Sequence, residues 1–255
     1  PVLVKNDKAM TMNLEKGQIR YESTGSGNDV VLFLHGFNNQ LAAWDAVWPL
    51  LDECGRRIRI DIPGFGGSSW PSETYALPAQ AARVISFMDK MALSHVNLVG
   101  VSMGGSLSAW IATHYPERVK GLILLAPSGF PGSLIHGTLF GKILRPGFLN
   151  RLASQIADSA LYRRLYPDSR ALQALTVTAS YGEPWAEALK KIRTPTHVLW
   201  SHGDVGVPFA LAEAVAHAIP GSTLVPLPTE VGHDIPGNSP KLVSELVCKL
   251  QRGKS

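Results

Sequence analysis

The residues with the clearest chemical potential are a serine and the glycines around it. The chain reads Asn97-Leu98-Val99-Gly100-Val101-Ser102-Met103-Gly104-Gly105. Small residues two positions before and after Ser102 permit a sharp turn from a strand into a helix, which exposes the hydroxyl above a sheet. The backbone N–H of Met103 would open that helix, where unpaired donors and the helix dipole favour an oxyanion. A phosphate loop does not fit, because no lysine follows and Gly-x-Gly-x-x-Gly is absent. The pattern predicts a nucleophilic serine.

A serine hydroxyl is a weak nucleophile at neutral pH, so Ser102 needs a base. His233 stands in Thr229-Glu230-Val231-Gly232-His233-Asp234, just after the apolar stretch 224–227, on a loop from which a ring could reach the serine. Enzymes with this serine turn carry nucleophile, acid and histidine in that chain order. This order favours His233 over His202, which precedes its neighbouring acid.

Asp204 is the candidate acid, because it follows the apolar run Val198-Leu199-Trp200 and sites of parallel sheets lie beyond the carboxyl ends of strands. It would accept the second imidazole N–H and fix the tautomer of the ring. Two alternatives stay open. Asp204 could only cap the helix that begins near Pro208, and Asp61 could be the acid, although it precedes the serine.

An early strand should supply a second oxyanion donor, and Val31-Leu32-Phe33-Leu34-His35-Gly36-Phe37 fits this role. Gly36 lets the backbone bend so that the N–H of Phe37 can point at the developing charge. His35 is interpreted as a structural turn residue rather than a base. The candidate substrate-contacting residues are Phe37, Trp44, Phe130, Arg163 and Arg164.

The elements that must position these residues follow from the hydrophobic pattern. Uninterrupted apolar runs at 30–34, 96–99, 122–126 and 197–200 suit parallel strands buried on both faces. Apolar stripes at helical spacing in 77–88, 107–111 and 211–219 lie between or after them. The alternation predicts an α/β fold with a mostly parallel sheet and helices on both faces. Residues 10–14 and 18–24 predict an antiparallel hairpin at the sheet edge.

One region breaks the alternation and carries the excess charge. Residues 130–191 lack a convincing strand and predict a helical lid, which leaves 1–129 and 192–255 as the core. The net charge is +4, and residues 136–170 contain six basic and two acidic residues, which account for all of it. Nucleic acid is disfavoured, since neither aromatic interleaving nor a DNA-binding motif is present. The charge is either a solvated helical face or a device that attracts an anionic or carrier-linked substrate, such as one on a phosphopantetheine carrier protein.

Composition excludes several other classes. With 255 residues, 45% hydrophobic and 17% charged, the chain is an ordinary globular protein rather than disordered, collagenous or coiled coil. No apolar stretch approaches the ~18 residues that a transmembrane helix needs. Charges near the N-terminus do not fit a secretory signal. Cys54 and Cys248 lie far apart and form neither a metal pattern nor a disulfide framework, which favours a reducing cytoplasm.

Taken together, the sequence resembles α/β-hydrolase-fold enzymes over nearly the whole chain. The segments that carry the resemblance are His35-Gly36-Phe37 with Trp44, Asp61-Ile62-Pro63-Gly64-Phe65-Gly66-Gly67-Ser68, Gly100 to Gly105, Tyr115-Pro116-Glu117-Arg118-Val119, Gly203-Asp204 with Val207-Pro208, and Gly232-His233. The resemblance implies an eight-stranded sheet and a lid inserted after the sixth strand. It also implies a triad of Ser102, His233 and Asp204, with oxyanion donation from the backbones of Phe37 and Met103.

Departures from related families narrow the expected chemistry. Similar haloalkane dehalogenases and epoxide hydrolases have aspartate where this chain has Ser102, and the triple glycine of many lipases and bulky-ester esterases is absent. We expect a serine hydrolase that cleaves a small or medium carboxylic ester through an acyl-enzyme, without cofactor or metal. The open alternatives are a carbon–carbon bond hydrolase of aromatic ring-fission products, a thioesterase or lactonase, and a small-molecule receptor on a slow hydrolase scaffold.

Overall fold

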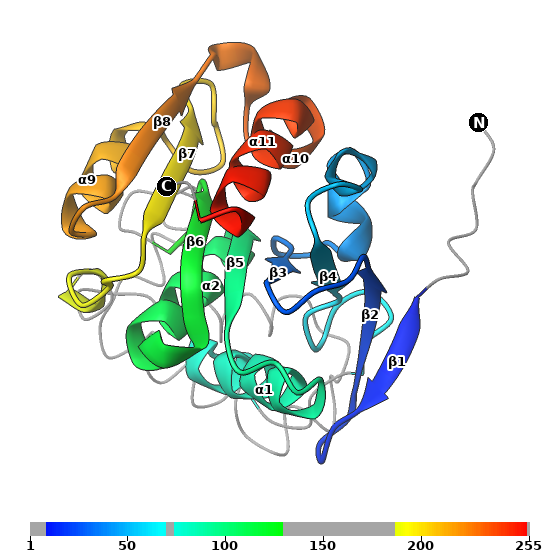
Figure 1. Ribbon diagram of the computed structural model, residues 1–255. Coiled ribbons are helices and arrows are strands. Elements are labelled where there is room, and N and C mark those ends of the chain that lie inside the picture. Colours follow the sequence, from blue (N-terminus) through cyan, green and yellow to red (C-terminus); the bar gives the residue numbers. More distant parts are fainter. Residues whose placement is uncertain (1–8, 70–73, 130–186, 254–255) are drawn as a thin grey trace.

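The computed structural model describes residues 9–69, 74–129 and 187–253 (Figure 1). They contain an eight-stranded sheet of order β1-β2-β4-β3-β5-β6-β7-β8. Only the pairs β1–β2 and β2–β4 are antiparallel. The strands are β1 (Met10–Asn13), β2 (Gln18–Thr24), β3 (Val30–Leu34), β4 (Arg56–Ile60), β5 (Val96–Val101), β6 (Val119–Leu125), β7 (Thr196–Ser201) and β8 (Thr223–Leu227). The predicted mostly parallel sheet with an edge hairpin is confirmed.

Helices cover both faces of this sheet. The α-helices in the described ranges are α1 (Leu77–Lys90), α2 (Met103–His114), α9 (Ala210–Ala218), α10 (Ile235–Asn238) and α11 (Pro240–Gln251), and the 3-10 helices are η1 (Leu41–Trp44), η2 (Trp48–Leu51), η3 (Pro116–Arg118) and η4 (Thr229–Val231). A Cβ on Gly100 would touch α2 at Ser108, and a Cβ on Gly121 would touch α11 at Leu250. Gly100 pairs with Leu124, three residues beyond Gly121 on β6. Side chains alternate along a strand, so α2 and α11 lie on opposite faces, as Figure 1 also shows.

The central strands are apolar because both of their faces are covered. All five residues of β3 and all six of β5 are buried, which is the burial that uninterrupted apolar runs indicate. At the sheet edge, β8 contains Pro226, whose missing N–H is tolerated on an outermost strand. None of the helices within the described ranges is long and apolar enough to cross a membrane.

Strand β4 is unusual because it carries buried arginines. The guanidinium of Arg59 binds Glu22 at 2.6 Å and lies 4.6 Å from the centre of the Trp48 ring. Arg57 lies over the same ring at 5.0 Å and donates to the carbonyl of Leu51 at 2.8 Å. Buried charge is tolerated when it is paired and hydrogen-bonded. This network therefore joins β2, β4 and η2 in the interior.

The predicted lid falls almost entirely outside the described residues, and so do Phe130, Arg163, Arg164 and the charge excess of 136–170. Its last residues are described: Ala188 and Leu189 are buried in the hydrophobic core, and Thr113 Oγ1 donates to the carbonyl of Ala188 at 3.3 Å. This end of the predicted insertion therefore packs with the core.

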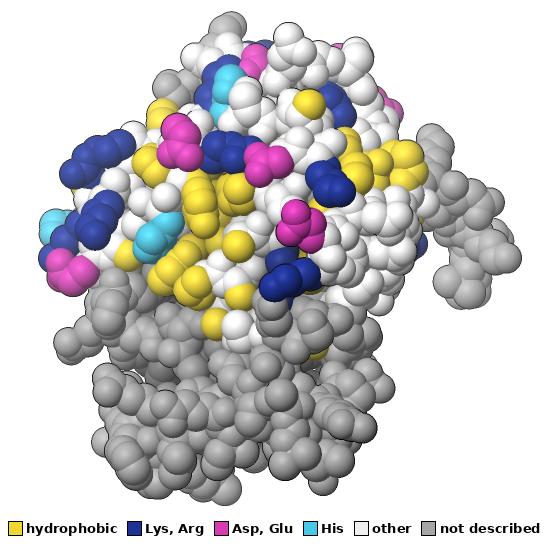
Figure 2. All heavy atoms as spheres, turned by 90° about the horizontal axis from the view of Figure 1, so that it is seen from below, with side chains coloured by type: hydrophobic (Ala, Val, Ile, Leu, Met, Phe, Trp, Pro, Cys, Tyr) yellow, Lys and Arg dark blue, Asp and Glu magenta, His cyan; other side chains and the backbone are white. Residues whose placement is uncertain are grey.

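On the face drawn in Figure 2, basic and acidic side chains of described residues are interspersed.

The two cysteines are paired, contrary to the expectation from the sequence. Cys54 and Cys248 form a disulfide across a separation of 194 residues, with their Cα atoms 5.1 Å apart. The prediction that they form no disulfide framework was wrong, because helix α11, which the sequence pattern did not reveal, packs against η2 and brings Cys248 beside Cys54. Disulfides persist mainly in oxidising compartments, so the expectation of a reducing cytoplasm loses the basis it had in these cysteines.

We expect the disulfide to be a major source of stability. A cross-link that closes a loop this long removes much of the entropy of the unfolded chain, and losing a native disulfide typically costs about 2 to 5 kcal/mol. The double variant Cys54→Ala, Cys248→Ala should lower the free energy of unfolding by that amount in urea titrations. The wild-type protein in reductant should fall to the same value, and equal stability of all three samples would contradict the prediction.

Candidate active site

Ser102 occupies a strained turn between β5 and α2. Its φ of 53° and ψ of −118° lie where non-glycine residues are rarely found. Two hydrogen bonds to the neighbouring strand and its exit loop hold it there: the Ser102 N–H donates to the carbonyl of Leu125 at 2.9 Å, and the Ser128 N–H donates to the carbonyl of Ser102 at 3.1 Å. Such strain persists only where surrounding contacts enforce it. The side chain of Ser102 is partly exposed, while Met103, the first residue of α2, is buried.

The glycines around the serine are required by close backbone packing. A Cβ on Gly100 would lie 2.2 Å from the carbonyl oxygen of Gly104, and a Cβ on Gly104 would lie 2.1 Å from that of Leu34. The start of α2 thus rests directly on β3 and β5. This is the tight strand-to-helix turn that the sequence predicts.

The structure brings Asp204 and His233 together. His233 Nδ1 lies 2.7 Å from Asp204 Oδ2, with the aspartate side chain fully buried and the histidine side chain 37% exposed. The other carboxylate oxygen accepts the N–H groups of Gly206 at 2.8 Å and Val207 at 2.7 Å. Asp204 does not cap α9, whose N-cap is Phe209 without a side-chain cap hydrogen bond. It orders the loop before that helix and contacts the histidine. Its carboxylate is held with one oxygen aimed at the ring.

Ser102, Asp204 and His233 all lie beyond the carboxyl ends of parallel strands. Ser102 follows β5, Asp204 follows β7 and His233 follows β8 through η4, and these strands are parallel. The loop after β3 lies beside the serine, because a Cβ on Gly36 would lie 3.4 Å from the Cβ of Ser102 and 4.0 Å from its Oγ. The neighbouring Phe37 is half-buried, with its ring 5.6 Å from that of Phe65.

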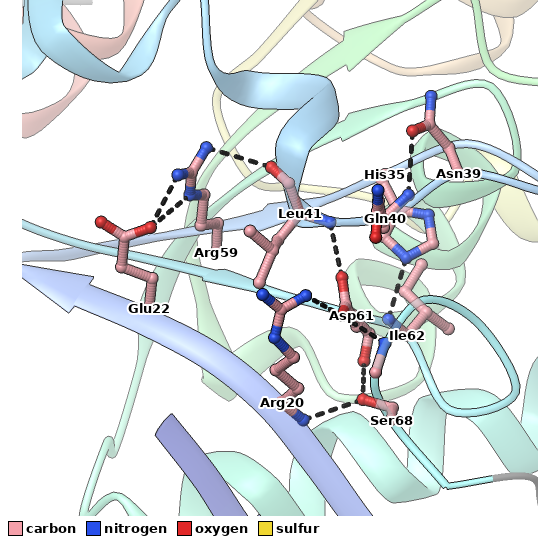
Figure 3. Close-up of polar contacts among 11 residues, drawn as sticks. Arg20, Glu22, His35, Asn39, Gln40, Leu41, Arg59, Asp61, Ile62 and Ser68 are labelled. Atoms are coloured by element: carbon pink, nitrogen blue, oxygen red, sulfur yellow. Dashed lines mark hydrogen bonds and ion pairs between the residues drawn. The ribbon is translucent and has the colours of Figure 1, made fainter. Parts of the chain in front are cut away.

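His35 is a buried structural residue that contacts the loops after β3 and β4, and Figure 3 shows its bond to Ile62. Its Nε2 accepts the N–H of Ile62 at 2.9 Å, so Nδ1 carries the proton and donates to the carbonyl of Gly36 at 2.7 Å. In a trans peptide the C=O and the next N–H point in opposite directions. By holding the carbonyl of Gly36, His35 therefore fixes the direction of the N–H of Phe37. Burial lowers the pKa of His35 to about 4.

Asp61 and His202, the alternatives from the sequence, have other partners. The buried Asp61 carboxylate accepts the N–H groups of Leu41 at 2.5 Å and Gly67 at 2.7 Å, and it binds Arg20 at 3.2 Å (Figure 3). These contacts tie the loops after β3 and β4 together. The His202 ring packs at a tilt against Phe209, with the two ring centres 3.8 Å apart. Neither residue occupies the place that Asp204 and His233 share.

Trp44 is a correction among the candidate substrate contacts. Its exposed fraction is zero, and its ring packs edge-on against Phe33 at 4.9 Å. It belongs to the core because η1 folds it under the loop that follows β3. Phe37 keeps its candidate role, and the remaining candidates, Phe130, Arg163 and Arg164, lie outside the described residues.

Ser201 is a residue of the site that the sequence analysis missed. Its buried hydroxyl contacts the loops that carry both Asp204 and His233. The available signal was a polar residue at the end of an otherwise apolar strand, shortly before the candidate acid.

Within the described part of the chain, no cluster of three or more His, Cys, Asp or Glu side chains could hold a metal ion.

The buried His35 should make stability depend on pH. Its pKa is lowered from 6.5 to about 4, chiefly by burial, so the unfolded chain takes up a proton before the folded one as pH falls. The contribution of neutral His35 to the free energy of unfolding is fully present above pH 6.5 and is lost as the pH falls from 6.5 to about 4. The total loss is roughly 3 kcal/mol. Urea titrations should show that the wild type loses about this much more stability between pH 7 and 4 than His35→Asn does. Equal losses in both proteins would refute the assignment.

Comparisons with known proteins agree with this architecture. The α/β hydrolase fold family matches residues 29–163. The uncharacterized hydrolase YugF of Bacillus subtilis (strain 168) is 29% identical over 246 residues, which cover 87% of this chain and 89% of that protein. A 2-hydroxy-6-oxononadienedioate/2-hydroxy-6-oxononatrienedioate hydrolase of Burkholderia vietnamiensis is 26% identical over 235 residues, covering 81% of this chain and 82% of that protein.

Solved structures share the same fold. A thermophilic esterase from Thermogutta terrifontis matches with a TM-score of 0.71 at 24% identity, covering 96% of this chain and 98% of that one. The family match spans more than half of the 255 residues, and it includes β3 to β6, which carry the serine turn and the loop beside it. This chain is therefore a hydrolase that belongs to the α/β-hydrolase fold family.

Proposed function

We propose that the protein is a serine hydrolase that cleaves a small or medium carboxylic ester through an acyl-enzyme on Ser102. The observation that carries the proposal is the 2.7 Å contact between His233 Nδ1 and Asp204 Oδ2. This contact lies beyond the carboxyl ends of the parallel strands, as the strained Ser102 does. A histidine held through Nδ1 by a buried carboxylate keeps Nε2 free to accept a proton. That arrangement is what a serine nucleophile requires.

In this mechanism Ser102 Oγ attacks the carbonyl carbon of the ester while His233 Nε2 takes the hydroxyl proton. The tetrahedral oxyanion accepts hydrogen bonds from the backbone N–H groups of Phe37 and Met103. Collapse of the intermediate breaks the ester C–O bond, and His233 gives its proton to the leaving alkoxide. A water molecule deprotonated by His233 then attacks the acyl carbon, releasing the acid and restoring Ser102. Asp204 stabilises the imidazolium in both steps.

Cleavage of a carbon–carbon bond in a ring-fission product is the second candidate. It is favoured by the relative from Burkholderia vietnamiensis that is named for such a reaction and by the Ser-Met-Gly-Gly run from Ser102 to Gly105. Thioesters and lactones need the same nucleophile and oxyanion donors, so they stay within the proposal as related substrates. A slow receptor built on this fold would keep the triad but would release product only once. An anionic or carrier-linked substrate stays a prediction from the charge of residues 136–170.

The experiment that tests the proposal measures turnover on p-nitrophenyl esters of rising acyl length beside a vinylogous diketone acid. We expect many turnovers per protein on short or medium esters, with kcat/KM decreasing for long acyl chains. Faster cleavage of the diketone acid than of every ester would assign the carbon–carbon reaction instead. A single slow turnover, with a shifted thermal midpoint, would identify a receptor and contradict the proposal.

A further inference from the structure

Ser201 connects the two loops that carry the candidate acid and histidine. It is the last residue of β7, where it pairs with Leu227 of β8, and it has no exposed surface. Its Oγ accepts the N–H of Gly203 at 3.1 Å and the N–H of Gly232 at 3.0 Å. It also donates to the carbonyl of Pro228 at 2.7 Å. Gly203 directly precedes Asp204 and Gly232 directly precedes His233, so one oxygen atom holds the backbones of both residues.

These three bonds use the whole capacity of the hydroxyl, which has one donor and two acceptor positions. The three hydrogen bonds lie where the backbones of the loops after β7 and β8 come into close contact. A Cβ on Gly203 would lie 1.9 Å from the carbonyl oxygen of Thr229. Gly232 adopts a φ of +61°, a left-handed conformation that glycine allows at little cost. The loops thus approach closely, and Ser201 supplies the polar contact that fixes how they meet.

We propose that Ser201 is a positioning residue that keeps Asp204 and His233 in register for proton transfer. The inference rests on the proposed function, in which these two residues serve Ser102. Without the hydroxyl, the N–H groups of Gly203 and Gly232 and the carbonyl of Pro228 lose their shared partner in a buried region. Unpaired buried groups draw the backbone towards other partners. The 2.7 Å contact between His233 Nδ1 and Asp204 Oδ2 then lengthens.

The test compares Ser201→Ala and Ser201→Cys with the wild-type enzyme. Alanine removes the hydroxyl, and cysteine fills the same space with a weak donor and acceptor, so cysteine serves as the second variant if alanine does not fold. We expect kcat to fall about 10-fold to 100-fold, because small misplacements of catalytic groups have effects of this size. KM should change little, since Ser201 is buried away from solvent.

A second readout reports the pair itself without any turnover. The proton between His233 Nδ1 and Asp204 Oδ2 should give a downfield proton NMR signal in the wild type, identified by its absence in Asp204→Asn. In the Ser201 variants this signal should move upfield or disappear. If the hydroxyl had a purely structural role, its loss would lower the melting temperature and leave the NMR signal in place.

The matched control is Thr196→Val at the opposite end of the same strand. Thr196 is also buried, and its hydroxyl donates to the carbonyl of Thr194 at 2.7 Å. Its loss should lower the melting temperature by several degrees and leave kcat and the NMR signal unchanged. If Ser201→Ala behaves like this control, the inference is overturned. If Ser102→Ala keeps full activity, the proposed function fails, and the NMR signal still decides whether Ser201 holds the pair.

Discussion

Ser102→Ala should abolish ester hydrolysis while the protein stays folded. Loss of the nucleophile in a serine triad typically lowers kcat by about 10⁴-fold to 10⁶-fold. The fold should tolerate the change because the hydrogen bonds that hold the turn come from the backbone N–H and carbonyl of residue 102. We therefore expect an unchanged thermal midpoint, to within a few degrees, and no turnover above background on the best ester of the panel.

Covalent labelling identifies the nucleophile independently of turnover. An organophosphonate should add one adduct mass to the wild-type protein and none to Ser102→Ala, as measured by intact-protein mass spectrometry. Ser244→Ala is a suitable control, since this serine lies in α11 and its hydroxyl donates to the carbonyl of Lys241 in the same helix. It should retain both labelling and activity. An adduct on Ser102→Ala would assign the nucleophile to another residue.

Asp204→Asn should lower kcat by about 10⁴-fold, the size of effect seen when the amide forces the wrong histidine tautomer in a serine triad. The structure gives the reason in this chain. The N–H groups of Gly206 and Val207 donate to Asp204 Oδ1, so in the variant they select the amide oxygen for that position. The amide NH₂ then faces His233 Nδ1 and requires that nitrogen to accept. The proton moves to Nε2, which can no longer accept the proton of Ser102.

Asp61→Asn is the matched control, because Asp61 is the other acid that the sequence leaves open. Its carboxylate binds Arg20 and the backbone N–H groups of Leu41 and Gly67. The substitution weakens an ion pair whose carboxylate is buried, so we expect a lower melting temperature with kcat retained within about threefold. The measurement is kcat at saturating ester for both variants. A large loss at Asp61→Asn with activity retained at Asp204→Asn would transfer the acid role to Asp61.

Local patterns in the sequence were sufficient to predict most of the sheet. The apolar runs at 30–34 and 197–200 correspond to β3 and β7, and the short segments at 10–14 and 18–24 form the edge hairpin. These predictions succeed because burial on both faces of a strand leaves a continuous apolar signal. The serine turn was equally readable, since the glycines at 100 and 104 are required by backbone contacts within 2.2 Å.

Features that depend on distant segments could not be predicted in this way. Helix α11 packs against η2 and pairs Cys248 with Cys54 across 194 residues, and no local pattern records that separation. The aromatic ring of Trp44 suited substrate contact in the sequence, but packing against Phe33 buries it completely. In both cases the partner, rather than the residue type, decides the role.

The sequence by itself determined the family resemblance and the candidate residues Ser102, Asp204 and His233. It also determined their order along the chain, which is nucleophile, acid and histidine. Only the tertiary structure decided which acid contacts the histidine, because Asp204 and Asp61 both follow buried strands and differ only in what lies beside them. It also revealed Ser201 as the contact between the two loops. The physical reason is that hydrogen bonds between loops depend on how parallel strands are ordered in the sheet, and that order is set by the packing of the whole chain.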